Sequence, residues 1–156
     1  MLQSRWVLRT ASVAAVAMVA WLSLTAASVA DESTKVHRLA LQISDKDPQK
    51  MNTVLNVAAN VSRYYSELGQ EVEVEVVAFN LGLHMLREDT SPIRERMQNY
   101  AKSMPNVKFM ACANTLAAMT KKEGSEPPLF EFAEMVPAGV VRLMELDEQG
   151  WTIIRP

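Results

Sequence analysis

The amino-acid sequence predicts one α/β domain with about five mainly parallel strands in a doubly wound sheet and helices on both faces. Short apolar runs alternate along the chain with segments of about ten to twenty residues whose apolar positions follow helical spacing, which is the pattern of parallel α/β folds. Residues 31–156 have the length of one ordinary domain, which can build a core without a disulfide or a metal.

The N-terminal segment has the three-part layout of a secretory signal peptide. Two arginines precede a mostly apolar run over residues 11–24, and Ser28 and Ala30 provide small side chains before a cleavage that follows Ala30. The run is shorter than the roughly 20 residues of a membrane-spanning helix, although an uncleaved anchor is the alternative. We therefore expect residues 1–30 to be a signal peptide, residues 31–156 to be the domain, and the protein to be periplasmic, without membrane attachment once the leader is removed.

The first strand and helix have clear signals. Residues 36–44 (VHRLALQIS) are rich in apolar side chains and predict a strand. Asp47 and Pro48 then provide an N-cap and a first helical residue. Apolar residues recur at helical spacing as far as Leu68, and Gly69 ends the predicted helix.

The middle of the chain predicts a second strand and a second helix. Residues 71–79 (EVEVEVVAF) alternate strictly and then become apolar, which predicts an edge strand whose first half has a solvated face. We expect residues 80–90 (NLGLHMLREDT) to form a loop. Residues 91–104 open with Ser-Pro and continue with apolar residues in helical rhythm, which predicts a helix that Pro105 ends.

The last part of the chain repeats the alternation. Residues 107–112 (VKFMAC) predict the third strand, and Asn114 is placed to cap a helix that runs to about Glu123. The remaining elements are a loop of lower order, a strand, a helix and a final strand, expected over residues 125–132, 133–137, 139–149 and 151–156.

Composition excludes several function classes. Residues 31–156 carry a small excess of acidic side chains, and no cluster of lysines and arginines is interleaved with aromatics, so we expect no nucleic-acid partner. The chain has no glycine-rich phosphate-binding motif, and no group of His, Cys and carboxylates has metal-ligand spacing. We therefore expect neither a cofactor nor a metal.

Cys112 is the main candidate for chemistry. It is the only cysteine in the chain, so it has no internal disulfide partner. It closes the third predicted strand, at the sheet edge where open α/β folds bind ligands, and a helix begins just after it. The N–H groups and partial positive charge of a helix N-terminus stabilise a thiolate, which favours a nucleophile or sulfur carrier. The alternative is a buried structural cysteine.

Three asparagines and a histidine are further candidates. Asn52, Asn56 and Asn60 are spaced four apart and share one face of the first helix. Because asparagine is a mediocre helix former, we expect these amides to serve a ligand or a subunit interface, the alternative being a solvated polar face. His84 follows the second strand and is the candidate proton partner of Cys112, the alternative being a surface loop histidine.

Two sequence patterns resemble those of DsrE/DsrF-like (YchN-like) proteins. They are Cys-x-Asn-Thr around Cys112 and Val-Pro-x-Gly…Gly-Trp-x-x-Ile-x-Pro at the end of the chain, and the likeness covers nearly all of residues 31–156. The resemblance implies a flavodoxin-like domain that assembles into homotrimers or hexamers. In the sulfur-relay branch, a cysteine at this position accepts sulfur as a persulfide and passes it to a partner protein. The resemblance also implies that Asn114 and Thr115 shape the turn that holds the thiol.

These observations lead to one main hypothesis. We expect a periplasmic sulfur-handling protein, a persulfide carrier or sulfurtransferase-like protein, that forms a homo-oligomer and exchanges sulfur with a donor or acceptor protein. Its expected site residues are the carrier Cys112, the proton partner His84 and the binding residues Asn114, Thr115, Asn52 and Asn56. One alternative is a non-enzymatic homo-oligomeric binding or assembly subunit in which Cys112 is structural. A second is a redox sensor that forms an intermolecular disulfide through Cys112.

Overall fold

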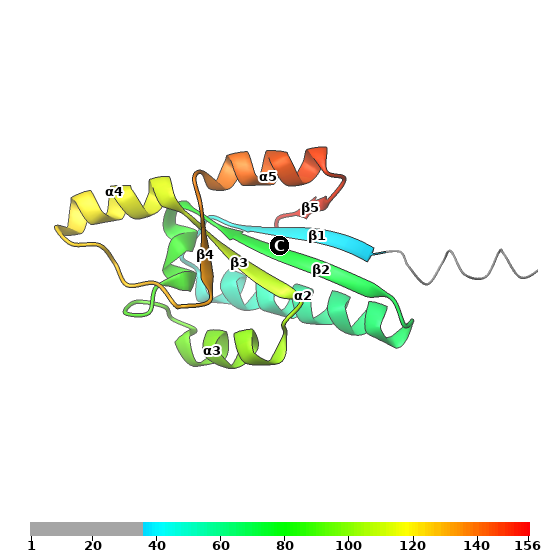
Figure 1. Cartoon of the computed structure of the whole chain (residues 1–156). Helices are drawn as coiled ribbons and strands as arrows, with labels where there is room; N and C mark the ends of the chain where they lie inside the picture. The colour runs from blue at the N-terminus through cyan, green and yellow to red at the C-terminus, as the bar shows by residue number, and fades with distance from the viewer. Residues whose placement is uncertain (1–35) are drawn as a thin grey trace, which may run out of the picture. The chain divides into compact units, whose positions relative to one another are not determined.

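The computed structural model describes residues 36–156, so the predicted signal peptide and residues 31–35 of the predicted domain lie outside the described part. Residues 36–156 form one compact unit with a five-stranded sheet of order β4-β3-β2-β1-β5. All four strand pairings are parallel (Figure 1). The prediction of a single flavodoxin-like, doubly wound parallel sheet is therefore confirmed.

Strands and helices alternate along the chain, as the sequence predicts. Their bounds are β1 Val36–Ile43, α2 Pro48–Glu67, β2 Glu71–Ala78, the 3₁₀ helix η2 Asn80–Leu86, α3 Arg94–Ser103, β3 Val107–Cys112, α4 Ala113–Glu123, β4 Ala133–Val136, α5 Gly139–Glu148 and β5 Thr152–Ile154. The α3 helix begins two residues after the predicted Ser-Pro start, because Ser91 forms a turn in which its hydroxyl donates a hydrogen bond to Met85 O (2.9 Å).

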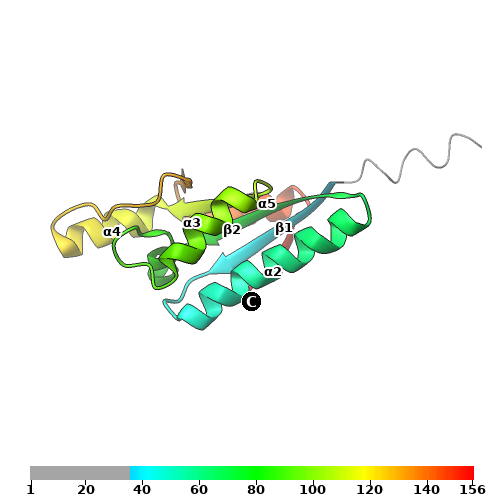
Figure 2. The same ribbon diagram turned by 90° about the horizontal axis from the view of Figure 1, so that it is seen from below.

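The helices form two layers around the sheet. Helices α2 and α3 pack on one face and α5 on the other, whereas α4 extends beyond the carboxyl end of β3 (Figures 1 and 2). The larger core lies on the α2 and α3 side and the smaller one lies under α5. A ligand site can therefore form at the carboxyl end of β3, between α4 and the start of α5.

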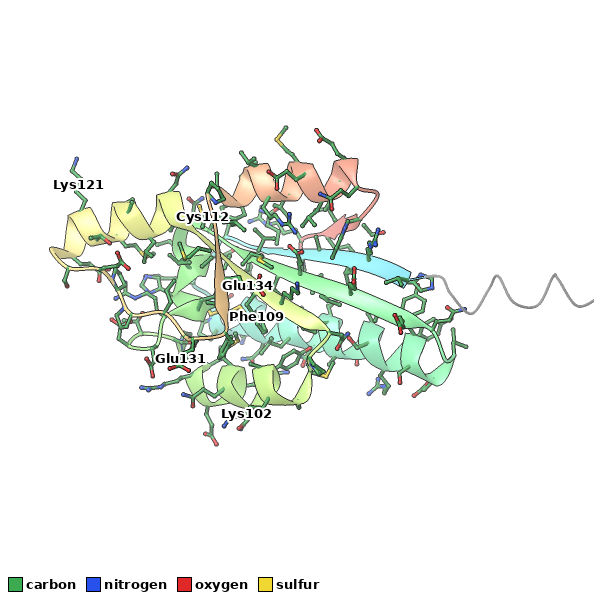
Figure 3. All side chains as sticks on the ribbon, in the orientation of Figure 1. Lys102, Phe109, Cys112, Lys121, Glu131 and Glu134 are labelled. Carbon is green, nitrogen blue, oxygen red and sulfur yellow. The ribbon has the colours of Figure 1, made fainter. Side chains whose placement is uncertain are left out.

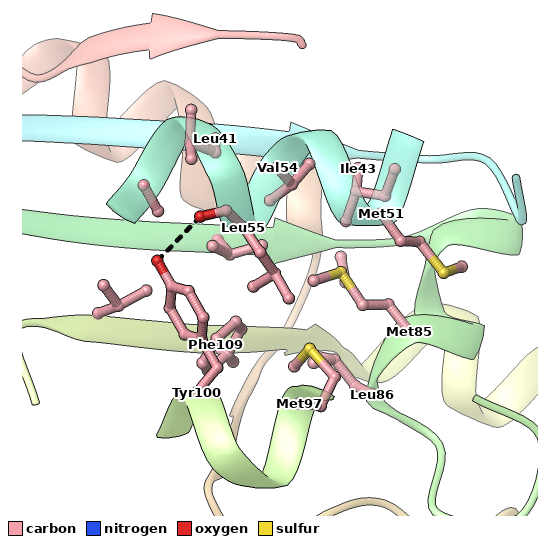
Figure 4. Packing of buried hydrophobic residues seen from close by; sticks show 14 of the residues in the cluster. Leu41, Ile43, Met51, Val54, Leu55, Met85, Leu86, Met97, Tyr100 and Phe109 are labelled. Atoms are coloured by element: carbon pink, nitrogen blue, oxygen red, sulfur yellow. Dashed lines mark hydrogen bonds between the residues drawn. The ribbon is translucent and has the colours of Figure 1, made fainter. Parts of the chain in front are cut away.

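Helix α2 shows how the sequence builds the larger core. Asp47 caps it by accepting a hydrogen bond from Gln49 N–H (2.8 Å), as predicted, and its apolar positions are buried against the sheet. On the neighbouring α3, the Tyr100 hydroxyl donates to Leu55 O (3.0 Å; Figure 4). Burial raises the pKa of Tyr100 to about 12, so this hydroxyl remains a donor across the physiological pH range.

The prediction that β2 is an edge strand is wrong, because β2 is the central strand between β1 and β3. Glu71 and Glu73 are exposed, but Glu75 is buried and forms a bidentate ion pair with Arg142 of α5 (2.6 and 2.9 Å). Helix α5 covers only part of this face of β2. Glu75 lies under the helix, whereas Glu71 and Glu73 lie beyond it and face solvent.

Two segments that the sequence predicts to be loops are packed against the domain. Residues 80–86 form η2, and Gly82 lies so close to β1 that a Cβ atom there would stand 2.2 Å from Ile43 O. Within residues 125–132, Phe130 is buried and its N–H donates to Leu86 O (3.0 Å). This segment is thus a tightly packed connection rather than a loop of lower order.

A buried arginine joins η2 to α4. Arg87 is 3% exposed, and its guanidinium contacts Glu123 at 2.6 Å and Asp89 at 2.7 Å. Both carboxylates remain partly exposed. Hydrogen bonds to the two carboxylates raise the pKa of Arg87, and its guanidinium lowers the pKa of each carboxyl group.

The Arg142–Glu75 pair should be strongly asymmetric to mutation. Arg142→Met leaves a buried carboxylate without its counter-ion, which we expect to lower the free energy of unfolding by about 3 kcal/mol. Glu75→Leu combined with Arg142→Met should recover most of this loss, since neither charge then needs solvation. Urea unfolding measures both effects, with Glu88→Ala at the exposed Arg94–Glu88 pair as the control, expected to cost less than about 1 kcal/mol. A double variant no more stable than Arg142→Met would contradict this account.

The Arg87 ion pairs predict a loss of stability in acid. The folded-state pKa values of Asp89 and Glu123 are lowered, so their contribution is fully present above the unfolded-state values of about 4 and is lost as the pH falls through the folded values. The urea concentration at the midpoint of unfolding should therefore decrease as the pH is lowered below about 4. Arg87→Met should make this fall shallower, because the two carboxyl groups then titrate near their ordinary values. Identical pH profiles for the two proteins would refute the assignment.

Candidate functional site

Cys112 lies where β3 meets α4 (Figure 3). It is the last residue of β3 and the N-cap of α4, so the prediction that Asn114 caps this helix is wrong. Asn114 instead lies in the first turn, and its N–H donates to Pro137 O (3.3 Å). Cys112 is 5% exposed.

The pKa of the Cys112 thiol lies below its ordinary value. Burial raises this pKa, but the nearby Thr115 hydroxyl and the backbone N–H groups of Gly139, Thr115 and Asn114 lower it by more. The Thr115 hydroxyl accepts a hydrogen bond from Asn80 N–H (3.0 Å), which leaves its own proton for the sulfur. The site is therefore built to stabilise a thiolate.

The backbone near Cys112 includes two conformationally restricted residues, Asn80 at the start of η2 and Gly139 at the start of α5. Asn80, at the start of η2, has φ +50° and is the one non-glycine residue with positive φ among residues 36–156. Gly139, the first residue of α5, lies so close to Phe79 that a Cβ atom would stand 2.9 Å from the ring atom Cδ1. The N-termini of α4 and α5 thus both reach Cys112, and each adds a partial positive charge.

A pocket of about 560 Å³ opens next to the thiol. Its walls come from η2, α4 and the start of α5. The polar side chains that line it belong to Asn80, His84, Asn114, Thr115, Lys122 and Glu123, and the apolar ones to Phe79, Leu81, Ala118, Met119, Ala138 and Val140. The structure therefore brings together four of the six residues that the sequence selected, namely Cys112, His84, Asn114 and Thr115.

His84 lines this pocket but forms no hydrogen bond to Cys112. Its Nδ1 lies 2.9 Å from Thr90 Oγ1, which leaves Nε2 for a molecule in the pocket. Burial and then the positive charges of Arg87 and Lys46 lower its pKa, which outweighs the opposite effect of nearby carboxylates. At neutral pH, His84 is therefore a neutral ring that can accept a proton.

Asn52 and Asn56 lie outside the pocket and contact α3 within the same chain. Both side-chain oxygens accept hydrogen bonds from the Arg96 guanidinium, the Asn56 bond at 2.6 Å. Asn60 accepts from Arg63 at 3.0 Å. The asparagine face thus joins two helices of one domain, and the structure does not bring it to the thiol.

Sequence reasoning missed Asn80, Gly139 and Lys122 as parts of the site. Asn80 and Gly139 each follow the end of a strand, in the segments Phe-Asn-Leu-Gly and Val-Pro-Ala-Gly, and that position was the available signal. Lys122 carries no signal by itself, because it becomes part of the pocket only through its place on α4.

Residues 36–156 contain neither a candidate membrane span nor a candidate metal cluster. No helix in this part of the chain is long and apolar enough to cross a membrane. The same residues contain no group of three or more His, Cys, Asp or Glu side chains placed to hold a metal ion.

Comparison with solved structures finds a protein of similar fold. No protein-family model and no curated protein matches the chain. The structure of a protein of unknown function, MTH1491 from Methanobacterium thermoautotrophicum, is similar at a TM-score of 0.61 and 30% sequence identity. The match covers 77% of this chain and 99% of that one. It supports the α/β fold and carries no function.

The role of Thr115 can be tested by its effect on thiol reactivity. A hydrogen bond to a charged group contributes about 1.5–3 kcal/mol, so Thr115→Val should lower the thiolate fraction of Cys112 at neutral pH about tenfold or more. Thr115→Ser keeps the hydroxyl and should restore most of it. The rate of alkylation by iodoacetamide as a function of pH measures the apparent pKa of Cys112 in each variant. Equal profiles for Thr115→Val and Thr115→Ser would show that the hydroxyl does not act on the sulfur.

Proposed function

We propose that this protein, which belongs to the same family as MTH1491, is a sulfur carrier in which Cys112 holds sulfur as a persulfide. The observation that carries the proposal is the place of one buried thiol at the carboxyl edge of the sheet, where it is the N-cap of α4 and lines a pocket together with Gly139, the first residue of α5. The N–H groups and partial positive charge of helix N-termini stabilise an anionic sulfur, and a structural cysteine has no need of them. The resemblance of the Cys112 motif to DsrE/DsrF-like proteins supports the same function.

The proposed transfer needs no oxidant or metal. The Cys112 thiolate attacks the outer sulfur of a persulfide, R–S–SH. A new S–S bond forms at Cys112, the S–S bond of the donor breaks, and the electron pair leaves with R–S⁻, while the proton stays on the transferred sulfur. The N–H groups at the starts of α4 and α5 stabilise the attacking thiolate.

His84 is the proposed proton acceptor for the second half of the cycle. It lines the same pocket and its lowered pKa keeps it neutral at neutral pH. The acceptor thiol gives its proton to His84, and its thiolate attacks the outer sulfur of Cys112–S–SH. The S–S bond at Cys112 breaks, the electron pair leaves as the Cys112 thiolate, and the persulfide proton stays on the transferred sulfur. In this proposal Thr115 stabilises the anionic sulfur through its hydroxyl and backbone N–H, and Asn114, whose N–H donates to Pro137 O, shapes the turn beside it.

Location and assembly are further parts of the proposal. The N-terminal sequence supports export and a periplasmic place of action. Assembly into a homo-oligomer is supported by exposed apolar side chains on α5, where Val140 and Met144 are 55% and 59% exposed.

The second candidate function, a non-enzymatic assembly subunit, is favoured by this exposed apolar face. In that case Cys112, which is 5% exposed, would serve only to pack the core. The two functions differ in whether the native thiol reacts.

Persulfide formation tests the proposal directly. After incubation with inorganic polysulfide, the intact mass should rise by one sulfur atom, and both dithiothreitol and cyanide should remove it, the latter as thiocyanate. Cys112→Ser should gain no reversible sulfur. Thr115→Val should gain sulfur at a rate lower than that of the native protein by about tenfold or more. Thr115→Ser should gain it at nearly the native rate. A native thiol that stays unmodified, while the unfolded protein is modified under the same conditions, would favour the assembly subunit.

A further inference from the structure

We infer that the sulfur donor is a small organic persulfide with a carboxylate at its far end, held along α4 with its sulfur at Cys112 and its carboxylate at Lys122. This inference deepens the proposed function and rests on it. It assigns to Lys122 the selection of the donor.

The depth of the thiol favours a small molecule over a rigid protein surface as the direct donor, and an acceptor protein would have to present its thiol on an extended segment. Transfer requires the donor sulfur to approach the Cys112 sulfur in line, and Cys112 is only 5% exposed beneath η2, α4 and the start of α5. The adjoining pocket of about 560 Å³ has the volume of a small-molecule site. A slender molecule can therefore reach the sulfur where a domain surface cannot.

The pocket is elongated because it follows one face of α4. Its lining residues on this helix recur at helical spacing from Thr115 through Ala118 and Met119 to Lys122. Cys112 and Lys122 are therefore separated by roughly 15 Å along the helix, at about 1.5 Å per residue. In Figure 3, Cys112 lies at one end of α4 and Lys121, the neighbour of Lys122, lies toward the other end. A single sulfide or thiosulfate ion would fill only one end of such a pocket.

The charges along the pocket select an anion. The carboxylate of Glu123 is held by Arg87 (2.6 Å), whereas Lys122 forms no ion pair among residues 36–156. The N-termini of α4 and α5 add partial positive charge at the inner end, and Lys46 is close enough to lower the pKa of His84. A donor with a carboxylate at its outer end and a leaving thiolate that develops negative charge at its inner end matches this arrangement.

The apolar residues between the two ends indicate an organic body for the donor. Ala118 and Met119 lie on α4, and Leu81 and Val140 face the same pocket from η2 and α5. Leu81 and Val140 are 50% and 55% exposed, so a carbon chain in the pocket would cover apolar surface that is otherwise solvated. A polysulfide ion offers no such contact.

Two donors of one skeleton provide the test, namely glutathione persulfide and the persulfide of glutathione diethyl ester, in which both carboxylates are masked. The rate of sulfur addition to Cys112 should be higher for the acid than for the ester. Lys122→Gln should lower the rate with the acid about two- to fivefold, as expected for one exposed charge pair, and leave the rate with the ester unchanged. Added salt should reduce the difference between the donors.

The matched control is Lys121→Gln, which removes the same charge from the next residue of α4, outside the pocket lining. It should leave both rates unchanged. Iodoacetamide, which is neutral, should alkylate Cys112 at the same rate in both lysine variants, and this would show that the thiol itself is unaltered.

The outcomes separate the inference from the proposed function. Equal rates with acid and ester, or equal effects of the two lysine variants, would overturn the inference and leave the sulfur-carrier function intact. If iodoacetamide modifies native Cys112 and neither persulfide nor polysulfide does, the sulfur-carrier function fails and the inference fails with it.

Discussion

The parallel register of three neighbouring strands is the constraint on which the site depends. Because β2, β3 and β4 run in the same direction, their carboxyl ends lie at one edge, and Cys112 pairs with Val136. The chain leaving β4 therefore begins α5 at Gly139 beside the sulfur, and the chain leaving β2 presents Asn80 to Thr115. A shift of one residue in either pairing would move these donors away from the thiol.

The buried Arg87, which follows η2, ties this edge of the domain to the end of α4. Arg87 is held by Asp89 in its own segment and by Glu123 at the far end of α4. Helix α4 lies largely beyond the sheet and contributes one buried side chain, Leu116, to the core, with Met119 partly buried beside it. The ion pairs therefore supply much of what fixes α4 against η2, and these two elements form opposite walls of the pocket. The Arg87–Glu123 ion pair at the C-terminal end of α4 thus helps to position a wall of the pocket that leads to Cys112 at the N-terminal end.

The structure separates two kinds of polar residue that look alike in the sequence. The amides of Asn52 and Asn56 serve the packing of α2 against α3 through Arg96, whereas Asn80 and Asn114 offer their backbone N–H groups near the thiol. Side-chain type therefore says little about function in this domain. Position relative to the carboxyl edge of the sheet is the better guide, since helix starts and strand ends meet there.

The sequence by itself determined the alternation of strands and helices and the place of Cys112 at the end of a strand, because hydrophobic periodicity and capping residues act over a few neighbouring positions. Only the tertiary structure decided that β2 is central, that Glu75 is buried against Arg142, and that Asn80 and Gly139 line one pocket with Cys112. These features join segments far apart in the chain. Strand register and the burial of a charge beside its partner depend on the whole fold, and a local pattern of residues carries no record of either.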